Sequence, residues 1–406
     1  MDDLLERLRA LPCGRRLLDA AAGVDGVHLT GGGVRDLLLG REPRELDVVV
    51  EGDVTALATG LGDVDAVHER FGTAIVRAGD CRWDLAAARS EEYARAGALP
   101  DVRAAGIEQD LLRRDVTVNA FALDLRTGAL RAVEHAYEDL EAGRLRVLHA
   151  ASFLDDPTRL WRIARYAARL GFELEQRTAR LAAQAVAAGA LESVSGARIG
   201  NELRLALGEP DPPAALEVAA GLGLAPWLAP DRPRTAVALN LLPGDEGRAD
   251  LVVLGASLDA AAGDTDRVLA ELEFTAAERE VLRACLQAGP LAVAVAAVAA
   301  RRPSELARVL RGVPVEAVAI AGADGATEAV RRWLHELRAV RLAITGDDLI
   351  AAGVPQGPEI GHRLETTLAR RLDGELEPGR DAELSEALRH RPPGAERRVP
   401  VPRVRT

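Results

Sequence analysis

The stretch His28–Asp53, HLTGGGVRDLLLGREPRELDVVVEGD, places a glycine-rich turn between two apolar runs. The second run opens on Glu45 and Asp47, two acids separated by one residue. Residues i and i+2 of a strand point to the same side, so the pair predicts a divalent cation that offsets the repulsion between the carboxylates. The glycines at 31–33 can let backbone amides close on a phosphate. A metal beside a triphosphate indicates nucleotidyl transfer.

The composition indicates a folded protein of several domains. At 406 residues, roughly two to four domains are expected. The 3% share of aromatic residues and the many Ala–Leu runs favour helices. A net charge of −12 argues against a general basic coat for nucleic acid, although it leaves room for a local basic groove. All 51 basic residues are arginines, which bind phosphate well.

The cysteines and the apolar segments indicate a cytoplasmic protein without a membrane anchor. Cys13, Cys81 and Cys285 lie far apart and lack metal-binding spacing, so we expect buried thiols in a reducing compartment. The first residues predict a short amphipathic helix rather than a signal peptide. The most apolar run, Leu291–Ala300, is about half the length that a membrane span needs. The sequence gives no indication of the oligomeric state.

Strand-like runs alternate with polar turns up to about residue 125 and then give way to helical spacing. The predicted fold class is an α/β head with a mixed sheet, followed by an all-helical neck, body and tail. The expected boundaries are 1–128 for the head, 129–195 for the neck, 196–325 for the body and 326–390 for the tail. The Pro- and Arg-rich residues 391–406 predict disorder.

A third acid for the metal site is expected on a neighbouring strand. Asp84, in RWDLAAAR, is the best placed by pattern. The alternative for Glu45 and Asp47 is an acidic strand edge that faces solvent. The glycine-rich turn upstream favours the metal site, with Mg²⁺ as the expected ion.

Several motifs in order resemble one family. They are TGGGVRDLLLG, ELDVVVEGD, FGTAIV, DLAAARSEEY, DLLRRDVTVNAFAL, LRVLHAASFLDDPTRLWRIARYAARLGF, ARIGNEL and TGDDLIAAGVPQGPEIG. Together they resemble the class II CCA-adding enzyme and bacterial poly(A) polymerase family, tRNA nucleotidyltransferases of the DNA polymerase β-like superfamily. One departure is Glu45, where the family usually has aspartate. Because Mg²⁺ tolerates little error in its octahedral shell, the longer side chain bears on the rate more than on the reaction type.

The resemblance implies a nucleotide site in the head. It assigns contacts to the incoming nucleotide to RRDVTVNA, and an arginine pair with an asparagine suits phosphate and ribose. The alternative is a turn in which the aspartate caps and the asparagine satisfies backbone. Arg35 is expected near phosphate, and Asp36 is expected to brace the turn. The residues assigned to nucleotide binding in the head are Gly32, Gly33, Arg35, Arg113, Arg114, Asp115 and Asn119.

The neck motif DDPTRLWRIARYAARLGF implies recognition of the base. Its apolar positions, including Leu160, predict a buried helix face opposite a row of arginines. The resemblance assigns Asp156 and Arg159 to the base, with Arg162 steadying the pair or touching phosphate. Cytosine and adenine place an amine donor beside a ring-nitrogen acceptor, which a carboxylate and a guanidinium match; guanine and uracil do not. The alternative for Asp156 is a helix N-cap before Pro157.

ARIGNEL predicts a structural ion pair between Arg198 and Glu202, one helical turn apart. No histidine is followed by aspartate, so the sequence shows no HD-type phosphohydrolase motif.

The resemblance implies a template-independent enzyme that adds C and A to the 3′ end of tRNA. Its substrates would be CTP and ATP, its cofactor Mg²⁺, and the tail would bind tRNA. Addition of CC only, of A only or of poly(A) stays open, and the segment Glu91–Gln109 could decide between them. A catalytically idle RNA-binding relative is the alternative from another class.

Overall fold

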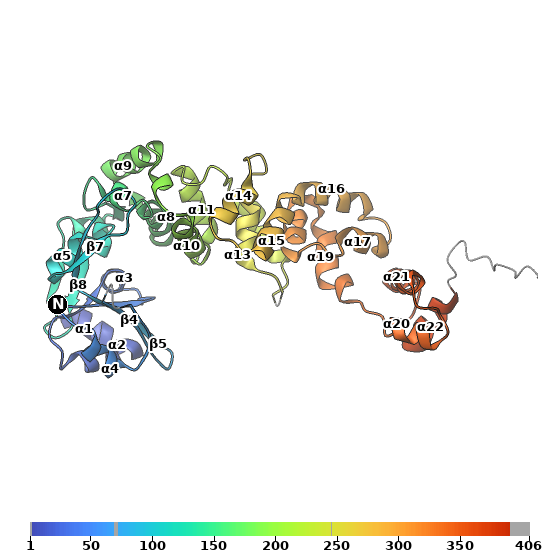
Figure 1. Ribbon diagram of the computed structural model, residues 1–406, viewed down its shortest axis with the longest axis horizontal. Coiled ribbons are helices and arrows are strands. Elements are labelled where there is room, and N and C mark those ends of the chain that lie inside the picture. Colours follow the sequence, from blue (N-terminus) through green and yellow to red (C-terminus); the bar gives the residue numbers. More distant parts are fainter. Residues whose placement is uncertain (1, 69–71, 245, 390–406) are drawn as a thin grey trace, which may run out of the picture. The chain divides into compact units, whose positions relative to one another are not determined.

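The computed structural model describes residues 2–68, 72–244 and 246–389 (Figure 1). The chain folds into two compact units. The first unit is formed by Met1–Ala229 with Arg267–Phe274, and the second by Pro230–Asp266 with Thr275–Thr406. The segment 391–406, for which the sequence predicts disorder, lies outside the described residues.

The first unit begins with a seven-stranded mixed sheet, as the sequence predicts. Its strands, in spatial order, are β3 (Asp63–His68), β4 (Thr73–Ala78), β5 (Cys81–Ala87), β2 (Leu46–Val50), β1 (Val27–Thr30), β8 (Phe121–Asp124) and β9 (Leu130–Ala132). All neighbours are antiparallel except β2 and β5, which run parallel. In that parallel pair Asp47 lies opposite Asp84. Apolar runs such as Val48–Val50 are buried and hold the centre of the sheet.

Short helices and one hairpin complete the head. They are α1 (Asp2–Ala10), α2 (Pro12–Ala21), α3 (Gly32–Leu38), α4 (Thr55–Leu61), the hairpin of β6 (Arg89–Glu92) and β7 (Asp101–Ala104), α5 (Ile107–Leu112) and the 3₁₀ turn η2 (Thr117–Asn119). Helices α1, α2 and α4 gather beside the sheet (Figure 1).

The expectation of three free thiols is wrong. Cys13 of α2 and Cys81 of β5 form a disulfide, while Cys285 is a buried free thiol. The pairing joins residues 68 positions apart, and sequence spacing could not reveal it because it depends on α2 packing against β5.

A helical segment follows in the same unit. It consists of α6 (Ala136–Glu141), β10 (Arg144–Leu145), α7 (Ser152–Asp155), α8 (Arg159–Leu170), β11 (Glu173–Leu174), α9 (Gln176–Ala187), η3 (Ala190–Ser193), α10 (Gly196–Leu207) and α11 (Pro212–Gly221). Helix α8 buries the predicted apolar face, including Leu160, Ile163 and Leu170. It ends at Gly171, whose φ of 70° suits glycine. Two short strands, β10 before α8 and β11 after it in the chain, pair in parallel with each other.

The second unit is helical throughout its described residues. It contains α12 (Arg232–Leu241), α13 (Ala249–Ala256), α15 (Ala276–Leu286), α16 (Ala288–Val298), α17 (Pro303–Leu310), α18 (Val315–Ala321), the π turn η4 (Gly322–Ala326), α19 (Thr327–His335), η5 (Leu337–Ala339), α20 (Gly346–Ala351), α21 (Pro358–Leu372) and α22 (Arg380–Arg389). Helix α14 (Thr265–Glu271) spans a boundary between the units. The mixed sheet followed by helices matches the predicted fold class, whereas the four predicted domain boundaries stay predictions.

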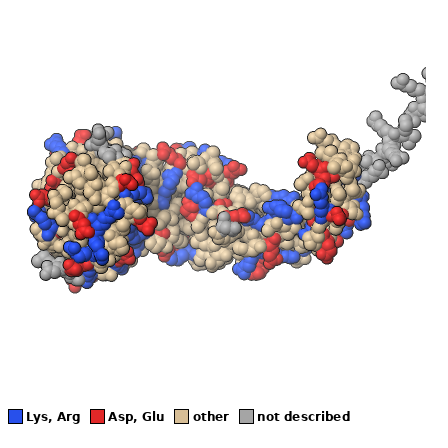
Figure 2. All heavy atoms as spheres, turned by 90° about the horizontal axis from the view of Figure 1, so that it is seen from below, with Lys and Arg blue, Asp and Glu red and all other residues tan. Residues whose placement is uncertain are grey.

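No single helix in the described ranges has the length and apolar character to cross a membrane. One pair, α15 and α16, passes that test jointly by length and composition, with a bend of 58° between its halves. On the face that Figure 2 shows, arginine and acidic side chains are interspersed rather than forming one basic coat.

Candidate active site

All residues that the sequence assigns to the site lie around one cavity of about 800 Å³ in the first unit. They come from helix α3, from strands β2 and β5 with the residue before β2, from the segment after α5, and from α8 with the turn before it. The lining residues predicted from sequence are Gly32, Gly33, Arg35, Glu45, Asp47, Asp84, Arg113, Asp115, Asn119, Asp156, Arg159 and Arg162. Their gathering is a finding, whereas their individual roles remain predictions.

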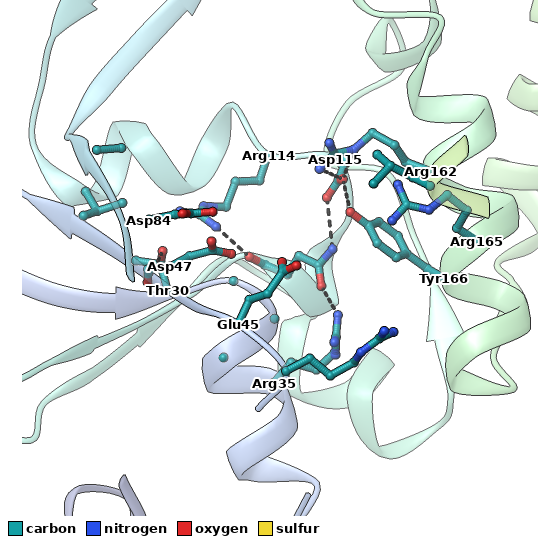
Figure 3. A pocket seen from close by; sticks show the side chains of 18 of the residues that line it. Thr30, Arg35, Glu45, Asp47, Asp84, Arg114, Asp115, Arg162, Arg165 and Tyr166 are labelled. Atoms are coloured by element: carbon teal, nitrogen blue, oxygen red, sulfur yellow. Dashed lines mark hydrogen bonds and ion pairs between the residues drawn. The ribbon is translucent and has the colours of Figure 1, made fainter. Parts of the chain in front are cut away.

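Three carboxylates form the sheet side of the cavity (Figure 3). Glu45 is exposed and directly precedes β2, while Asp47 lies within β2, opposite Asp84 of β5. Burial raises the pKa of Asp47 to about 6, and the charges of Glu45 and Asp84 add to that rise while Arg114 opposes it. Asp84 also accepts two hydrogen bonds from Arg82, at 3.0 and 3.1 Å. The three acids therefore act on one another electrostatically.

The glycine turn brings the chain close to the carboxylates. Gly31 has a φ of 66°, and a Cβ there would lie 2.8 Å from Nη1 of Arg114. The left-handed backbone conformation therefore favours glycine at this position, and a larger residue would also displace the Arg114 guanidinium. Helix α3 begins at the next residue, and its residues 33–37 are buried.

Arg35, expected near phosphate, is 3% exposed and holds the turn together. Its Nη1 donates to Oδ1 of Asn119 at 2.6 Å, and its Nε and Nη2 donate to Oδ1 of Asp36 at 2.9 and 2.7 Å. The bracing expected of Asp36 is thus present. Arg35 shares that task with Asp36, and its guanidinium links α3 to the segment after α5.

A buried acid that sequence reasoning missed fixes the arginine pair. Asp110 of α5 accepts hydrogen bonds from Arg113 at 2.7 and 2.9 Å and from Arg114 at 3.1 Å. Burial alone would raise the pKa of Asp110, but the two guanidinium charges outweigh it and hold that pKa below its usual value. The spacing of three and four residues on a helix was the available signal. Arg113 also bonds Glu91 at 3.2 Å.

Asp115 is a buried junction between the head segment and α8. Its Oδ2 accepts from Nε of Arg162 at 2.7 Å and from the hydroxyl of Tyr166 at 2.9 Å. Its Oδ1 accepts from the backbone of Val116 and from Nδ2 of Asn119. Burial opposes ionisation here, yet Arg162 and Arg159 hold the pKa of Asp115 well below its usual range. Tyr166, one turn after Arg162, was not predicted.

The two residues expected to read a base are each held by other groups. Oδ1 of Asp156 accepts from the backbone and hydroxyl of Thr158 and, at 2.8 Å, from Nη2 of Arg198. Arg159, 5% exposed, donates to Ser152 at 2.8 Å and to the carbonyl of Arg113 at 2.7 Å. The alternative of Asp156 as a cap before Pro157 is also present in the structure: its backbone is extended, its Oδ1 accepts the backbone N–H of Thr158 at 3.1 Å and its carbonyl accepts from the N–H of Arg159 at 3.1 Å, although the regular helix α8 begins at Arg159.

The ion pair expected between Arg198 and Glu202 is wrong. Arg198 instead bonds Asp156 and, at 3.1 Å, the carbonyl of Gly97. Glu202 accepts from Nη1 of Arg165 at 2.8 Å. Both residues point from α10 toward neighbouring elements because tertiary partners are available there, which local spacing does not reveal.

Comparison with known proteins decides the family. Residues 27–146 match the model of the poly A polymerase head domain. Over 371 residues the chain is 36% identical to the CC-adding tRNA nucleotidyltransferase of Deinococcus radiodurans, covering 88% of each protein. The chain belongs to the tRNA nucleotidyltransferase family.

Two further tRNA nucleotidyltransferases resemble this chain over most of its length. The A-adding tRNA nucleotidyltransferase of Geobacter sulfurreducens is 34% identical over 89% of the chain. The chain spans 45% of that relative's own length, which is less than half. The Thermotoga maritima CCA-adding enzyme complexed with tRNA matches with a TM-score of 0.74 and 27% identity, over 95% of this chain and 97% of that one.

Nucleotidyltransferases of this family generally use a divalent metal ion. The carboxylates of Glu45, Asp47 and Asp84 are the hard oxygen donors that such an ion prefers. Within the described ranges, no three acidic, histidine or cysteine side chains are already close enough to hold a metal. Asp47 and Asp84 are nevertheless opposite each other on parallel strands and line one cavity together with Glu45, so the donor set that is present fits such an ion.

Proposed function

We propose that the chain is a template-independent nucleotidyltransferase that adds C and A to the 3′ end of tRNA. It takes the nucleotides from CTP and ATP and releases pyrophosphate. One observation carries the proposal: Asp47 and Asp84, paired on parallel strands, line the same cavity as Asp156 and Arg159. A reaction centre and a base-reading pair thus share one space of about 800 Å³, within the usual range for a small-molecule site.

In this proposal the carboxylates of Glu45, Asp47 and Asp84 hold Mg²⁺. The ion supplies charge stabilisation for attack of the tRNA 3′-hydroxyl on the α-phosphate. Arg113 is the residue proposed for the triphosphate oxygens, and Asp110 keeps its guanidinium oriented. Asn119 is proposed for the ribose.

Selection of C and A is assigned to Asp156 and Arg159. The carboxylate accepts from the exocyclic amine of cytosine or adenine, and the guanidinium donates to the adjacent ring nitrogen. Guanine and uracil would oppose a carbonyl to the carboxylate and leave both acceptors unpaired. Oδ2 of Asp156 carries no hydrogen bond among those found in the described residues, whereas Oδ1 binds Arg198 and Thr158, which supports a base-facing oxygen.

Addition of only part of CCA is the second candidate. Two relatives of similar sequence identity are named for adding different parts of it. The Geobacter sulfurreducens relative is named for A addition and the Deinococcus radiodurans relative for CC addition. Either division uses the same centre and differs in which acceptor end is extended.

The test offers tRNAs that end before, within and just short of CCA, with one nucleoside triphosphate at a time and with Mg²⁺, and sizes the products. Extension of the shortest acceptor with CTP, together with extension of the acceptor that ends in CC with ATP, supports the first candidate, while only one of these two extensions supports the second. Long A tails identify a poly(A) polymerase. A complete lack of extension would contradict the proposal and favour an idle RNA-binding relative.

A further inference from the structure

Glu209 lies in the turn between α10 and α11, within the first unit, and its carboxylate is 2% exposed. It lines the same cavity as the predicted site residues. The sequence marks this turn only as a helix break, EPDPP, and gives the acid no role. A buried carboxylate requires partners, since an unpaired charge is costly to remove from water.

Three arginines from two separate segments supply those partners. Arg44, directly before Glu45, donates to Oε2 of Glu209 at 3.3 Å. Arg165 of α8 donates to Oε1 at 3.1 Å, and Nε of Arg169 approaches Oε2 at 3.6 Å. The carboxylate of Glu209 thus links the start of β2 to α8. Arg44 and Glu209 are 165 residues apart in the sequence.

The geometry connects the two ends of the proposed site. Arg44 directly precedes Glu45 in the chain. A contact that holds Arg44 in place therefore also restricts the position of Glu45. On the other side, Arg165 and Arg169 share α8 with Arg159 and Arg162. Three guanidinium groups would repel one another without the carboxylate between them. Figure 3 shows Arg165 beside Arg162 and Tyr166 on the side of α8, and Glu45 near Asp47 on the side of the sheet.

We propose that Glu209 is a positioning residue that sets the register between Glu45 and the base-reading helix α8. The inference rests on the proposed function for its effect on rate. Glu209 contacts no substrate in this proposal. It acts by holding Arg44 against Arg165 and Arg169, so that the carboxylate end and the α8 end of the cavity keep one separation.

The main test is Glu209→Gln, which keeps the shape and removes the charge. Misplacement of a reacting group by about 1 Å can cost about a hundredfold in rate, so a fall in kcat of at least about tenfold is expected. KM for CTP and ATP should stay within about threefold, because the arginines and the base-reading pair remain. Glu209→Asp, which keeps the charge with a shorter reach, should recover part of kcat.

Arg44→Gln provides a variant that does not threaten the fold, since the side chain of Arg44 is 52% exposed. It should lower kcat in the same direction as Glu209→Gln, and the double variant should be no slower than Glu209→Gln alone. Such non-additivity is the signature of two residues acting through one contact. Fully additive losses would overturn the proposal.

A second readout is independent of turnover. Hydrogen exchange of the backbone amides at 41–46 should accelerate in Glu209→Gln, because the start of β2 loses its tie to α8. Faster exchange in Glu209→Gln supports the positioning role even if the wild-type protein extends no acceptor. A lack of extension by the wild-type protein would count against the proposed function and not against the positioning role. Unchanged exchange at 41–46 overturns the inference whatever the activity.

The matched control is Asp324→Asn in the second unit. Asp324 accepts two hydrogen bonds from Arg234, at 2.7 and 2.8 Å, and does not line the cavity. Its loss should leave kcat and the exchange of residues 41–46 unchanged. A Glu209→Gln protein that loses nucleotide binding and kcat in equal measure, with reduced helix content by circular dichroism, would show a purely structural role and overturn the positioning proposal.

Discussion

Arg162 of α8 and Asp115 of the segment after α5 approach to 2.7 Å, and they join the sheet-bearing part of the first unit to its helical part. The carboxylate side is 5% exposed and the guanidinium side 40%. Tyr166 completes the contact from the next turn of α8. The placement of the three carboxylates relative to Asp156 and Arg159 therefore depends on this junction.

Asp115→Asn should destabilise the protein by roughly 2–4 kcal/mol, because it leaves Arg162 and Tyr166 without their charged partner. Chemical denaturation followed by circular dichroism measures the change. Asp25→Asn is the control, since Asp25 and Arg126 form an exposed pair that should contribute less than about 1 kcal/mol. Equal losses in the two variants would contradict the role of the junction.

The pH dependence of stability should carry the signature of Asp115. Its pKa is lower in the folded protein than in the unfolded chain, so the unfolded state takes up the proton first. The stabilisation is present at neutral pH and declines below about pH 5, as the carboxyl of the unfolded chain becomes protonated. Urea midpoints at pH 7, 5 and 4 should therefore fall less steeply in Asp115→Asn than in the wild type. Parallel curves would refute this assignment.

Asp47→Asn should lower the rate of nucleotide transfer by at least about a hundredfold and leave the fold intact. The amide keeps the shape but removes the charge that a divalent cation requires. Single-turnover transfer across a range of Mg²⁺ concentrations measures the effect, with thermal unfolding as the check on folding. Wild-type turnover in this variant would remove Asp47 from the metal site.

Asp156→Ala should relax the preference for C and A over U and G by roughly ten- to two-hundredfold, more than it slows transfer of CTP and ATP. The measurement is kcat/KM for each of the four nucleotides on one acceptor. Because Asp156 also holds Arg198, Arg198→Gln is the matched control for the loss of that contact. If Asp156→Ala retains full discrimination, the base-reading role fails.

Reduction of the Cys13–Cys81 disulfide should lower stability by up to about 4 kcal/mol, as expected when a loop of 68 residues is released in the unfolded chain. The double variant Cys13→Ser/Cys81→Ser should unfold at a lower temperature than the wild type and respond no further to dithiothreitol. Free-thiol counting by mass spectrometry establishes the starting state. A wild-type protein with three free thiols would show that the bond does not form.

The sequence was sufficient to predict the sheet, the helical remainder and the set of residues around the cavity. Local patterns carry this information: alternating apolar runs such as Val48–Val50, and helical spacing along α8. The partners of those residues could not be predicted. Arg198 bonds Asp156 rather than Glu202, and Cys13 bonds Cys81, because these contacts arise only once distant elements pack.

Two buried acids that hold arginines of the cavity, Asp110 and Glu209, also differ in how they could be found. Asp110 precedes Arg113 and Arg114 at helical spacing, so a search for charge pairs along α5 would have identified it. Glu209 follows α10 and pairs with Arg44, which precedes β2 and lies 165 residues away in the sequence. No rule of local spacing therefore predicts this pair. Residues that fix a site from a distance are the part that a single sequence conceals.

The parallel pairing of β2 and β5 has a consequence for how this site can vary. Side chains alternate sides along a strand, so deleting one residue before Asp84 within β5 would turn that carboxylate to the opposite face of the sheet. Insertions or deletions within the ladder from Leu46 to Val50 should therefore be absent from active members.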